Sequence, residues 1–293
     1  MKTKIVFLGL LLALFTISCN KDKEESTITA DEAMANTKVD VASDDVSDIV
    51  EGQFDATMEN SASGKTSGVE NASPNLPACV SVVRTPAQGT PITAGTLVTK
   101  TITFGTATAG CPMPNGNVLK GSIIISFTYQ PTATSHTITY TFDNFYHNNI
   151  KFDGSKTFTR TLSTGTTIHP IVVMTMDMTA TFPNGNILHR VGTRTREIVA
   201  GYNTPLVFAD NVYQITGNWT TTFPNTTVQT STITSPLMVK MSCIAVNKPL
   251  LVQGVITFVR NSHIATLDYG TGDCDNAAVF TLDGVAYPIT IGN

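Results

Sequence analysis

The sequence predicts an all-β protein, an antiparallel multi-stranded meander that follows a disordered N-terminal tether with one short helix. Beyond residue 71, apolar residues alternate with threonine and serine through many short segments. A period of two sustained this long is typical of antiparallel strands with one buried and one solvated face. Turns rich in Gly, Pro and Asn separate the segments. The pattern leaves open whether the strands form a sandwich or an open, curved, barrel-like sheet.

The segment at residues 172–182 shows this alternation most clearly. Its apolar face is formed by Val172, Met174, Met176, Met178, Ala180 and Phe182. Threonine suits the opposite face because it is both β-branched and polar. Other expected strands are residues 80–85, 97–104, 122–129, 137–142, 157–162, 212–223, 227–233, 237–245, 250–259, 263–269, 277–282 and 285–291. A Pro-Asn-Gly-Asn turn occurs at both 114–117 and 183–186, which indicates either a duplicated hairpin or common turn chemistry.

The N-terminus predicts export and a lipid anchor. Lys2 and Lys4 precede an apolar run at residues 5–17, and a small residue then precedes Cys19. This order is that of a secretory signal, and the run is shorter than the ~20 residues needed to span a bilayer. The position of Cys19 looks like a lipobox, in which the cysteine is acylated, although Thr16 stands where Leu is usual. The alternative is an ordinary signal peptide with an incidental cysteine.

An acidic segment separates this signal from the expected sheet. Residues 20–70 contain 13 of the 22 Asp and Glu residues of the chain but only four of its Lys residues. Apolar residues at three- and four-residue spacing predict a short helix over residues 44–59. We therefore divide the chain into a lipoprotein signal peptide at 1–18, an acidic tether at 19–70 and an all-β domain at 71–293. The small basic excess of that domain does not indicate a nucleic-acid partner.

Four cysteines remain after Cys19, and an even number in an exported chain suggests two disulfides. Four cysteines allow three pairings. We expect Cys79–Cys111 and Cys243–Cys274, because each pair flanks neighbouring strands of a meander. The alternative, free buried thiols, is disfavoured in an oxidising compartment.

Several stretches of residues 71–293 carry a family resemblance. They are Cys79-Val80-Ser81-Val82, Lys100-Thr101-Ile102-Thr103-Phe104-Gly105, Lys120-Gly121-Ser122-Ile123-Ile124-Ile125, Gly192-Thr193-Arg194-Thr195-Arg196-Glu197, Val212-Tyr213-Gln214-Ile215-Thr216-Gly217 and Asp268-Tyr269-Gly270-Thr271-Gly272-Asp273-Cys274-Asp275-Asn276. Together they resemble uncharacterised lipoproteins of the Bacteroidetes. The acidic run after Cys19 likewise resembles the export signal of surface lipoproteins in that group. The resemblance implies a lipid-anchored protein of the bacterial outer membrane, exposed at the cell surface, and it carries no activity.

Arg190, Arg194 and Arg196 have the same parity on one expected strand. On an exposed face they would form a patch for a phosphate, a carboxylate or an acidic glycan, because guanidinium groups bind such oxyanions. The alternative is a solvated strand face whose arginines pair with neighbouring acidic residues.

Asp268, Asp273 and Asp275 lie in and beside a glycine-rich loop, where carboxylates are candidate calcium ligands. Their spacing matches no EF-hand, and turn formation is the simpler interpretation. The five histidines show no metal-ligand spacing, and no Gly-x-Ser-x-Gly elbow occurs. An acid–base pair of Asp177 and Glu197 is a further hypothesis. We expect no cofactor.

Three functions are compatible with these observations. The first is a non-enzymatic surface lipoprotein that binds a glycan, an envelope component or a protein, or that serves as a structural subunit. The second is a carrier of lipids or other hydrophobic ligands in an open β half-barrel, with the methionine stripe of residues 174–178 lining the concave side. The third is a hydrolase whose site the sequence does not reveal.

Overall fold

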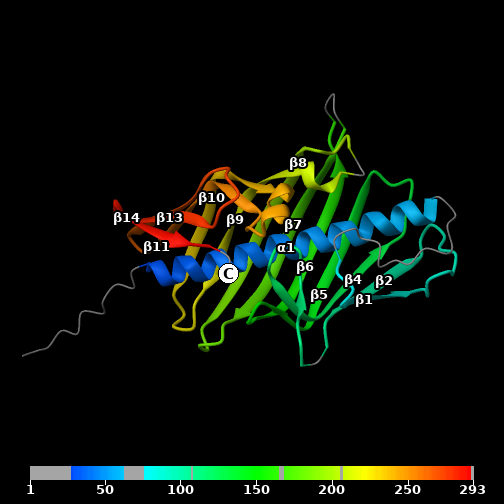
Figure 1. The fold of residues 1–293 in the computed structure, drawn as a ribbon, viewed down its shortest axis with the longest axis horizontal. Coiled ribbons are helices and arrows are strands. Elements are labelled where there is room, and N and C mark those ends of the chain that lie inside the picture. The colour runs from blue at the N-terminus through cyan, green and yellow to red at the C-terminus, as the bar shows by residue number, and fades with distance from the viewer. Residues whose placement is uncertain (1–27, 63–75, 107, 165–167, 205–206, 292–293) are drawn as a thin grey trace, which may run out of the picture.

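The protein is a long antiparallel sheet curved around a long helix (Figure 1). The computed structural model describes residues 28–62, 76–106, 108–164, 168–204 and 207–291. Within these ranges the strands are β1 (Val80–Thr85), β2 (Leu97–Phe104), β3 (Cys111–Pro112), β4 (Val118–Thr128), β5 (Ser135–His147), β6 (Ile150–Leu162), β7 (Pro170–Thr181), β8 (Ile187–Ala200), β9 (Val212–Thr222), β10 (Val228–Lys240), β11 (Leu251–Arg260), β12 (His263–Thr271), β13 (Ala277–Leu282) and β14 (Val285–Thr290). The helices are α1 (Ala30–Ala62) and two 3-10 turns, η1 (Phe208–Asp210) and η2 (Met241–Val246).

Strands that are consecutive in the chain are neighbours in the sheet. The one departure is the short β3, which pairs only with β4. Strand β2 pairs directly with β4. Strands β1 and β14 form the two edges of the described sheet. The predicted antiparallel meander is therefore confirmed, and of the two expected architectures the chain adopts the open, curved sheet.

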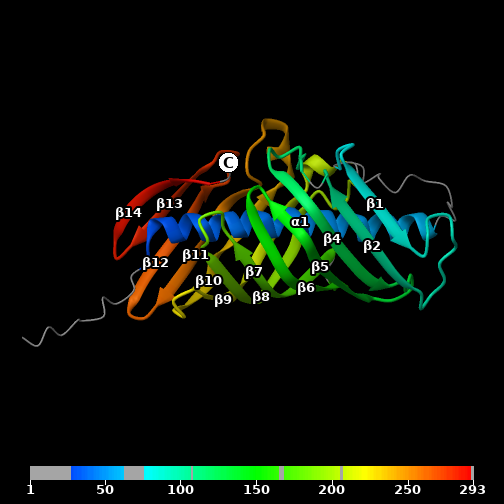
Figure 2. The same ribbon diagram turned by 90° about the horizontal axis from the view of Figure 1, so that it is seen from below.

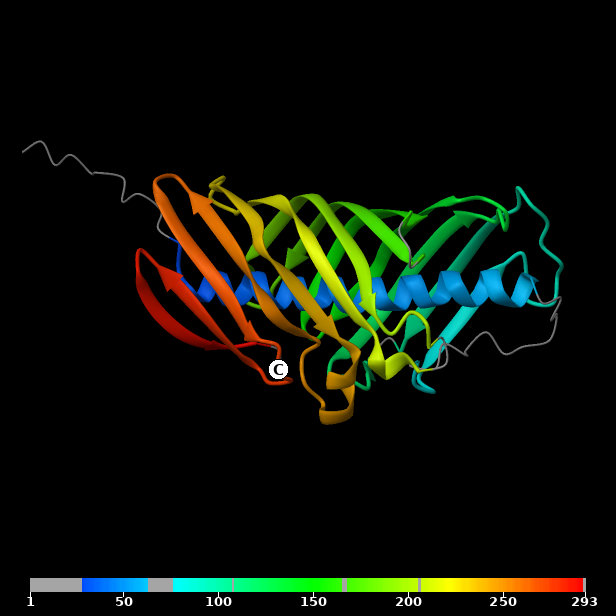
Figure 3. The same cartoon turned by 90° about the horizontal axis from the view of Figure 1, so that it is seen from above.

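Helix α1 is longer than predicted and belongs to the core. It begins at Ala30, not at residue 44, because Thr29 and Glu32 form a capping box: the Glu32 amide donates to Thr29 Oγ1 and the Thr29 amide donates to Glu32 Oε2. The helix runs along the concave side of the sheet and the strands cross it obliquely (Figures 2 and 3). Val46, Val50 and Phe54 are buried against the sheet. The helix predicted at residues 44–59 is thus present, but it extends back to Ala30 and packs in the core.

Two hydrophobic clusters fill the trough between sheet and helix. The first joins the middle and the C-terminal half of α1 to strands β1–β8. The second joins Ile28 and Ala33 to strands β9–β14, and it includes Trp219, the one tryptophan of the chain. The helix is therefore the shared centre of both clusters.

The outer face of the sheet carries a row of small polar side chains, all but one of them hydroxylated, as the alternation predicted. The register of successive strands aligns Thr85, Thr99, Ser126, Thr139, Thr157, Thr175, Thr193, Asn218, Thr232, Thr257, Thr266 and Thr281. Some neighbours in the row are within hydrogen-bonding distance, such as Thr139 and Thr157 at 3.3 Å between hydroxyl oxygens. Most of the large apolar side chains of the sheet therefore lie on the concave face, although Val173, Val191 and Val259 are exposed on the outer face.

Glycine permits the long strands to bend. Gly154 in β6 and Gly217 in β9 have φ of 108° and 140°, a region that L side chains rarely adopt. A Cβ atom at Gly154 would overlap the Asp177 carbonyl of β7, and one at Gly217 would overlap the Thr193 carbonyl of β8. Such positions allow a sheet to curve, here around α1.

Both predicted disulfides are present. Cys79, just before β1, bonds to Cys111 of β3, with 5.6 Å between their Cα atoms. Cys243 of η2 bonds to Cys274 in the loop after β12, with 5.2 Å between Cα atoms. The first fixes the β1 edge of the sheet, and the second fixes η2 to the last strands.

Candidate functional site

Three arginines of β8 lie on the concave face, beneath α1. Arg190, Arg194 and Arg196 share one parity, as predicted, but each is at most 1% exposed. The expectation of a solvent-exposed cationic patch is therefore wrong for these side chains. Their anionic partners are carboxylates of the same chain.

Arg190 and Arg194 converge on one carboxylate. Arg190 Nη1 lies 2.7 Å and Arg194 Nη2 lies 2.5 Å from Asp40 Oδ1. Burial favours a neutral carboxyl group, but the two guanidinium groups outweigh it and hold the pKa of Asp40 below its ordinary value. Arg194 also lies 4.2 Å from the centroid of the Trp219 ring. These contacts fix the middle of α1 to β8 and β9.

Arg196 has the opposite balance, since one guanidinium meets two carboxylates. It donates hydrogen bonds to Asp48 and, at 2.8 Å, to Glu51, and it lies 3.5 Å from the centroid of the Tyr213 ring. Burial raises the pKa of Asp48 to about 7 despite the attraction of Arg196, and repulsion from Glu51 and Asp45 adds to the rise. This cluster therefore carries an excess of negative charge.

Basic side chains of the sheet contact acceptor groups of the helix, carboxylate or neutral, along the rest of α1. Further contacts join Lys100 Nζ to the Gln53 carbonyl at 2.8 Å, His147 Nε2 to Asp45 Oδ2 at 2.7 Å, Lys156 Nζ to Ser43 Oγ at 2.5 Å and Arg260 Nη1 to Glu32 Oε1 at 3.0 Å. Burial lowers the pKa of Lys156 to about 7, and the charge of Arg194 acts in the same direction. The helix is thus the internal counter-ion of a basic trough.

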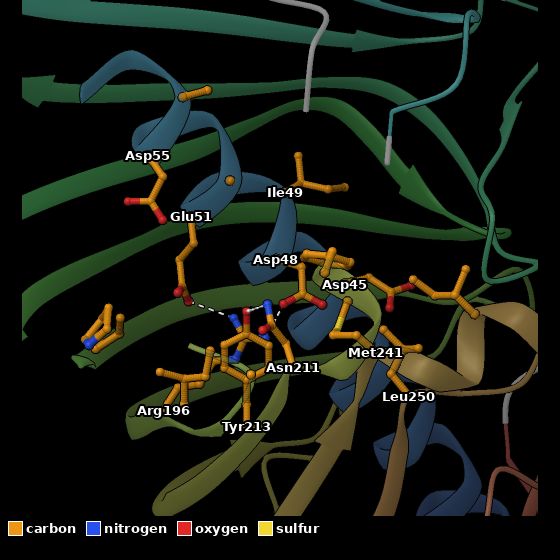
Figure 4. A pocket seen from close by; sticks show the side chains of 18 of the residues that line it. Asp45, Asp48, Ile49, Glu51, Asp55, Arg196, Asn211, Tyr213, Met241 and Leu250 are labelled. Carbon is orange, nitrogen blue, oxygen red and sulfur yellow. Dashed lines mark hydrogen bonds and ion pairs between the residues drawn. The ribbon is translucent and has the colours of Figure 1, made fainter. Parts of the chain in front are cut away.

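A groove of about 830 Å³ runs along the C-terminal half of α1, and we call it the α1 groove. Its acidic wall, on the helix, contains Asp45, Asp48, Glu51, Asp55 and Glu59. Its apolar wall, formed by loops, η1 and η2, contains Leu76, Met113, Phe208, Met241, Ile244 and Leu250. In Figure 4, Asp48 and Glu51 face Arg196 and Tyr213, and Met241 and Leu250 lie on the other side of Asp48. The groove therefore has one charged and one apolar side.

The acidic wall contains one buried oxygen without a partner. The Asp48 side chain is 10% exposed and its Oδ1 contacts Arg196, but its Oδ2 has no hydrogen-bond partner among the described residues. Asp55, two helical turns further along, lies 3.1 Å from Arg160 Nη2, and burial raises its pKa to about 6. The groove can thus accept hydrogen bonds from a bound molecule, and it can bind a proton near neutral pH.

The glycine-rich loop makes turn contacts. Asp268 accepts a hydrogen bond from the Gly270 amide at 2.9 Å, Asp275 from the Ala277 amide at 3.0 Å, and Asp273 contacts Thr271 Oγ1 at 3.4 Å. In the described part of the chain, no three His, Cys, Asp or Glu side chains are grouped to hold a metal ion. The geometry matches the turn-forming interpretation.

The other sequence-based candidates are not brought together. Asp177 pairs with His189 at 2.8 Å and Glu197 with His169 at 2.6 Å. Glu197 lies opposite Ile171 of β7, six residues from Asp177, which is about 20 Å along a strand. The pair therefore does not share one site.

The methionine stripe packs on the helix. Met174, Met176 and Met178 belong to the same buried cluster as Val39 and Val46 of α1. The concave surface expected for a hydrophobic ligand is thus occupied by the chain itself. Cys19 lies outside the described residues.

The acidic residues of the groove were not singled out by the sequence. Two signals together could have found them. The Thr29-x-x-Glu32 capping box predicts a longer helix. The three arginines on one face of β8 require buried counter-ions if that face lies in the core.

The chain matches no known family model, no curated protein and no solved structure. Among the described residues, no helix has the length and apolar character to cross a membrane.

Proposed function

We propose that this protein is a non-enzymatic, lipid-anchored lipoprotein displayed on the bacterial outer-membrane surface, and that it binds an amphiphilic ligand in the α1 groove. The observation that supports ligand binding is the groove itself, in which a carboxylate wall faces a wall of Met, Leu, Ile and Phe side chains. Its volume lies in the range of small-molecule sites, which are typically apolar with a few placed polar groups.

The scaffold around the groove is suited to binding. The buried ion pairs hold α1 in place along β8, and the Cys243–Cys274 disulfide holds η2. A site held by rigid elements needs little ordering when a ligand binds, which favours affinity.

The hydrophobic-carrier alternative takes a different form in this fold. A ligand on the methionine stripe would have to displace α1, because Val39 and Val46 cover that surface. A ligand in the α1 groove requires no such displacement. We therefore assign the apolar part of the ligand to the loop and η2 wall.

The anchor is tested by metabolic labelling with a palmitate analogue. Wild type should incorporate the label and Cys19→Ala should not. Equal labelling of both would overturn the anchor. Digestion of intact cells by an added protease then tests surface display, which requires the anchored protein to be cleaved without lysis.

Binding is tested with a variant that fills the groove. Ala56 lines the groove on α1 and makes no ion pair, so Ala56→Trp should block the site with little effect on the ion pairs. Isothermal titration with dodecyl-chain amphiphiles below their micellar concentration should show binding to wild type and at least tenfold weaker binding to the variant. Ala286→Trp, at an exposed position of β14, is the matched control and should bind like wild type. Equal binding by both variants would place the ligand elsewhere.

A further inference from the structure

We infer that the α1 groove selects amphiphiles whose head group is a cation of the amine type over those with an anionic or uncharged head group. This inference rests on the proposed function, since it names the class of ligand that the same groove takes. Three features of the groove carry it: its charge, its unpartnered acceptor and the arrangement of its two walls.

The charge of the groove excludes an anionic head group. Its described lining contains five carboxylates but only two arginines, Arg160 and Arg196. Arg196 is paired with Asp48 and Glu51, and Arg160 lies 3.1 Å from Asp55. Both guanidinium groups are thus paired with the helix through their Nη atoms, although the buried Nε atom of each has no partner among the described residues, and the carboxylates still outnumber the arginines. An anion entering here would be repelled by the carboxylates that outnumber the arginines.

The unpartnered oxygen calls for a donor. Asp48 Oδ2 is buried and accepts no hydrogen bond among the described residues, an arrangement that costs free energy. An ammonium group carries three donors and no acceptor, so it can satisfy Asp48 and another carboxylate at once. Charge-assisted hydrogen bonds of this type are roughly twice as strong as neutral ones. A hydroxyl group could satisfy the same oxygen, but it would leave the excess charge uncompensated.

The apolar wall distinguishes an amphiphile from a simple cation. Met241 and Leu250 lie on the side of Asp48 opposite to Glu51 (Figure 4), so a head group at Asp48 directs its chain along η2. Met and Leu side chains adapt to an alkyl chain, and each buried methylene contributes ~0.8 kcal/mol. A metal cation would use the carboxylates but leave this wall in water.

The inference is tested by titrating wild type at pH 8 with dodecylamine, dodecanol, dodecanoate and Ca²⁺, each by calorimetry. Dodecylamine should bind at least tenfold more tightly than dodecanol or dodecanoate, and Ca²⁺ should bind more weakly than dodecylamine. Asp48→Asn should weaken amine binding about tenfold and leave dodecanol binding within twofold of wild type. Glu197→Gln, at a partly exposed carboxylate outside the groove, is the charge-matched control and should change neither value.

The outcomes separate this inference from the proposed function. If dodecanoate or dodecanol binds as tightly as the amine, the inference fails and the amphiphile site stands. If no amphiphile binds, both fail, and tight binding of Ca²⁺ alone would show a cation site of another kind. Should Asp48→Asn unfold, Glu59→Gln removes one exposed groove carboxylate without touching the buried cluster, and it should weaken amine binding two- to fourfold. Unchanged amine binding by Glu59→Gln would then count against the inference.

Discussion

Asp40→Asn is the most direct test of whether α1 is part of the folded core. Asp40 is wholly buried and is the carboxylate on which Arg190 and Arg194 converge, at 2.7 and 2.5 Å. The substitution keeps the size of the side chain but removes its charge. It therefore isolates the electrostatic link between the helix and β8.

The expected loss follows from what the two arginines retain. Arg190 keeps hydrogen bonds to the Asn36 carbonyl and side chain, at 3.1 and 2.6 Å, whereas the carboxylate that Arg194 keeps among the described residues is Asp44, at 3.9 Å. Removing one partner of a buried ion pair typically costs ~3–5 kcal/mol, because a desolvated charge is left without compensation. Two guanidinium groups depend on this carboxylate, so we expect a loss of about 4 kcal/mol.

The assay is urea unfolding followed by Trp219 fluorescence and by the helical circular dichroism signal. Both signals should move to lower urea together, since Trp219 and α1 share one core. Asp31→Asn, at an exposed position in the first turn of α1, is the matched control and should cost less than ~0.5 kcal/mol. A loss below ~1 kcal/mol for Asp40→Asn, or two separate transitions in wild type, would refute the idea that the ion pairs hold the helix in the core.

Three further predictions concern stability. Because the pKa of Asp48 is raised to about 7 from an ordinary value of 3.8, the folded state holds a proton that the unfolded state has lost. The free energy of unfolding should therefore fall from pH 5 to pH 7, and Asp48 should contribute about 2 kcal/mol of that fall. In Asp48→Asn the fall over this pH range should be smaller by the same amount. Replacing Cys243 and Cys274 by Ser should cost roughly 3–4 kcal/mol, and the same change at Cys79 and Cys111 should cost nearly as much, because the loops differ by one residue. Gly192→Ala should cost ~1–3 kcal/mol and shift Trp219 emission to longer wavelength, because a Cβ atom would overlap Trp219; Thr193→Ala, on the exposed face, should do neither.

The sheet and its disulfides were predictable because their signals are local. Alternation within each strand identifies the two faces, as at residues 172–182, and an exported chain with four cysteines is expected to pair them. In a meander the strand order follows the chain, so the pairings Cys79–Cys111 and Cys243–Cys274 could be predicted from strands that are neighbours in the sequence.

The helix and the site were not predictable in the same way. The sheet-facing side of α1 carries Asn36, Asp40 and Ser43 as well as apolar residues, so apolar spacing identifies only part of the helix. Polar residues can be buried in a core only where other polar groups pair with them. The partners of Asp40 are Arg190 and Arg194, which are 150 and 154 residues away in the sequence. The arginine parity of β8 was visible, but which face it occupied depended on this distant contact.

The position of α1 in the core also limits how far the folded domain can lie from the proposed lipid anchor. If the lipid is on Cys19, Ile28 lies only nine residues further along the chain, and it is buried against the C-terminal strands. Nine residues span at most about 30 Å, whereas a free tether of 50 residues would reach several times further. The β9–β14 end of the trough must then lie close to the membrane. Residues 45–59 of the helix are roughly 20–45 Å further along its axis, at a rise of 1.5 Å per residue. The α1 groove is therefore held at a fixed distance beyond the end of the trough that is closest to the anchor.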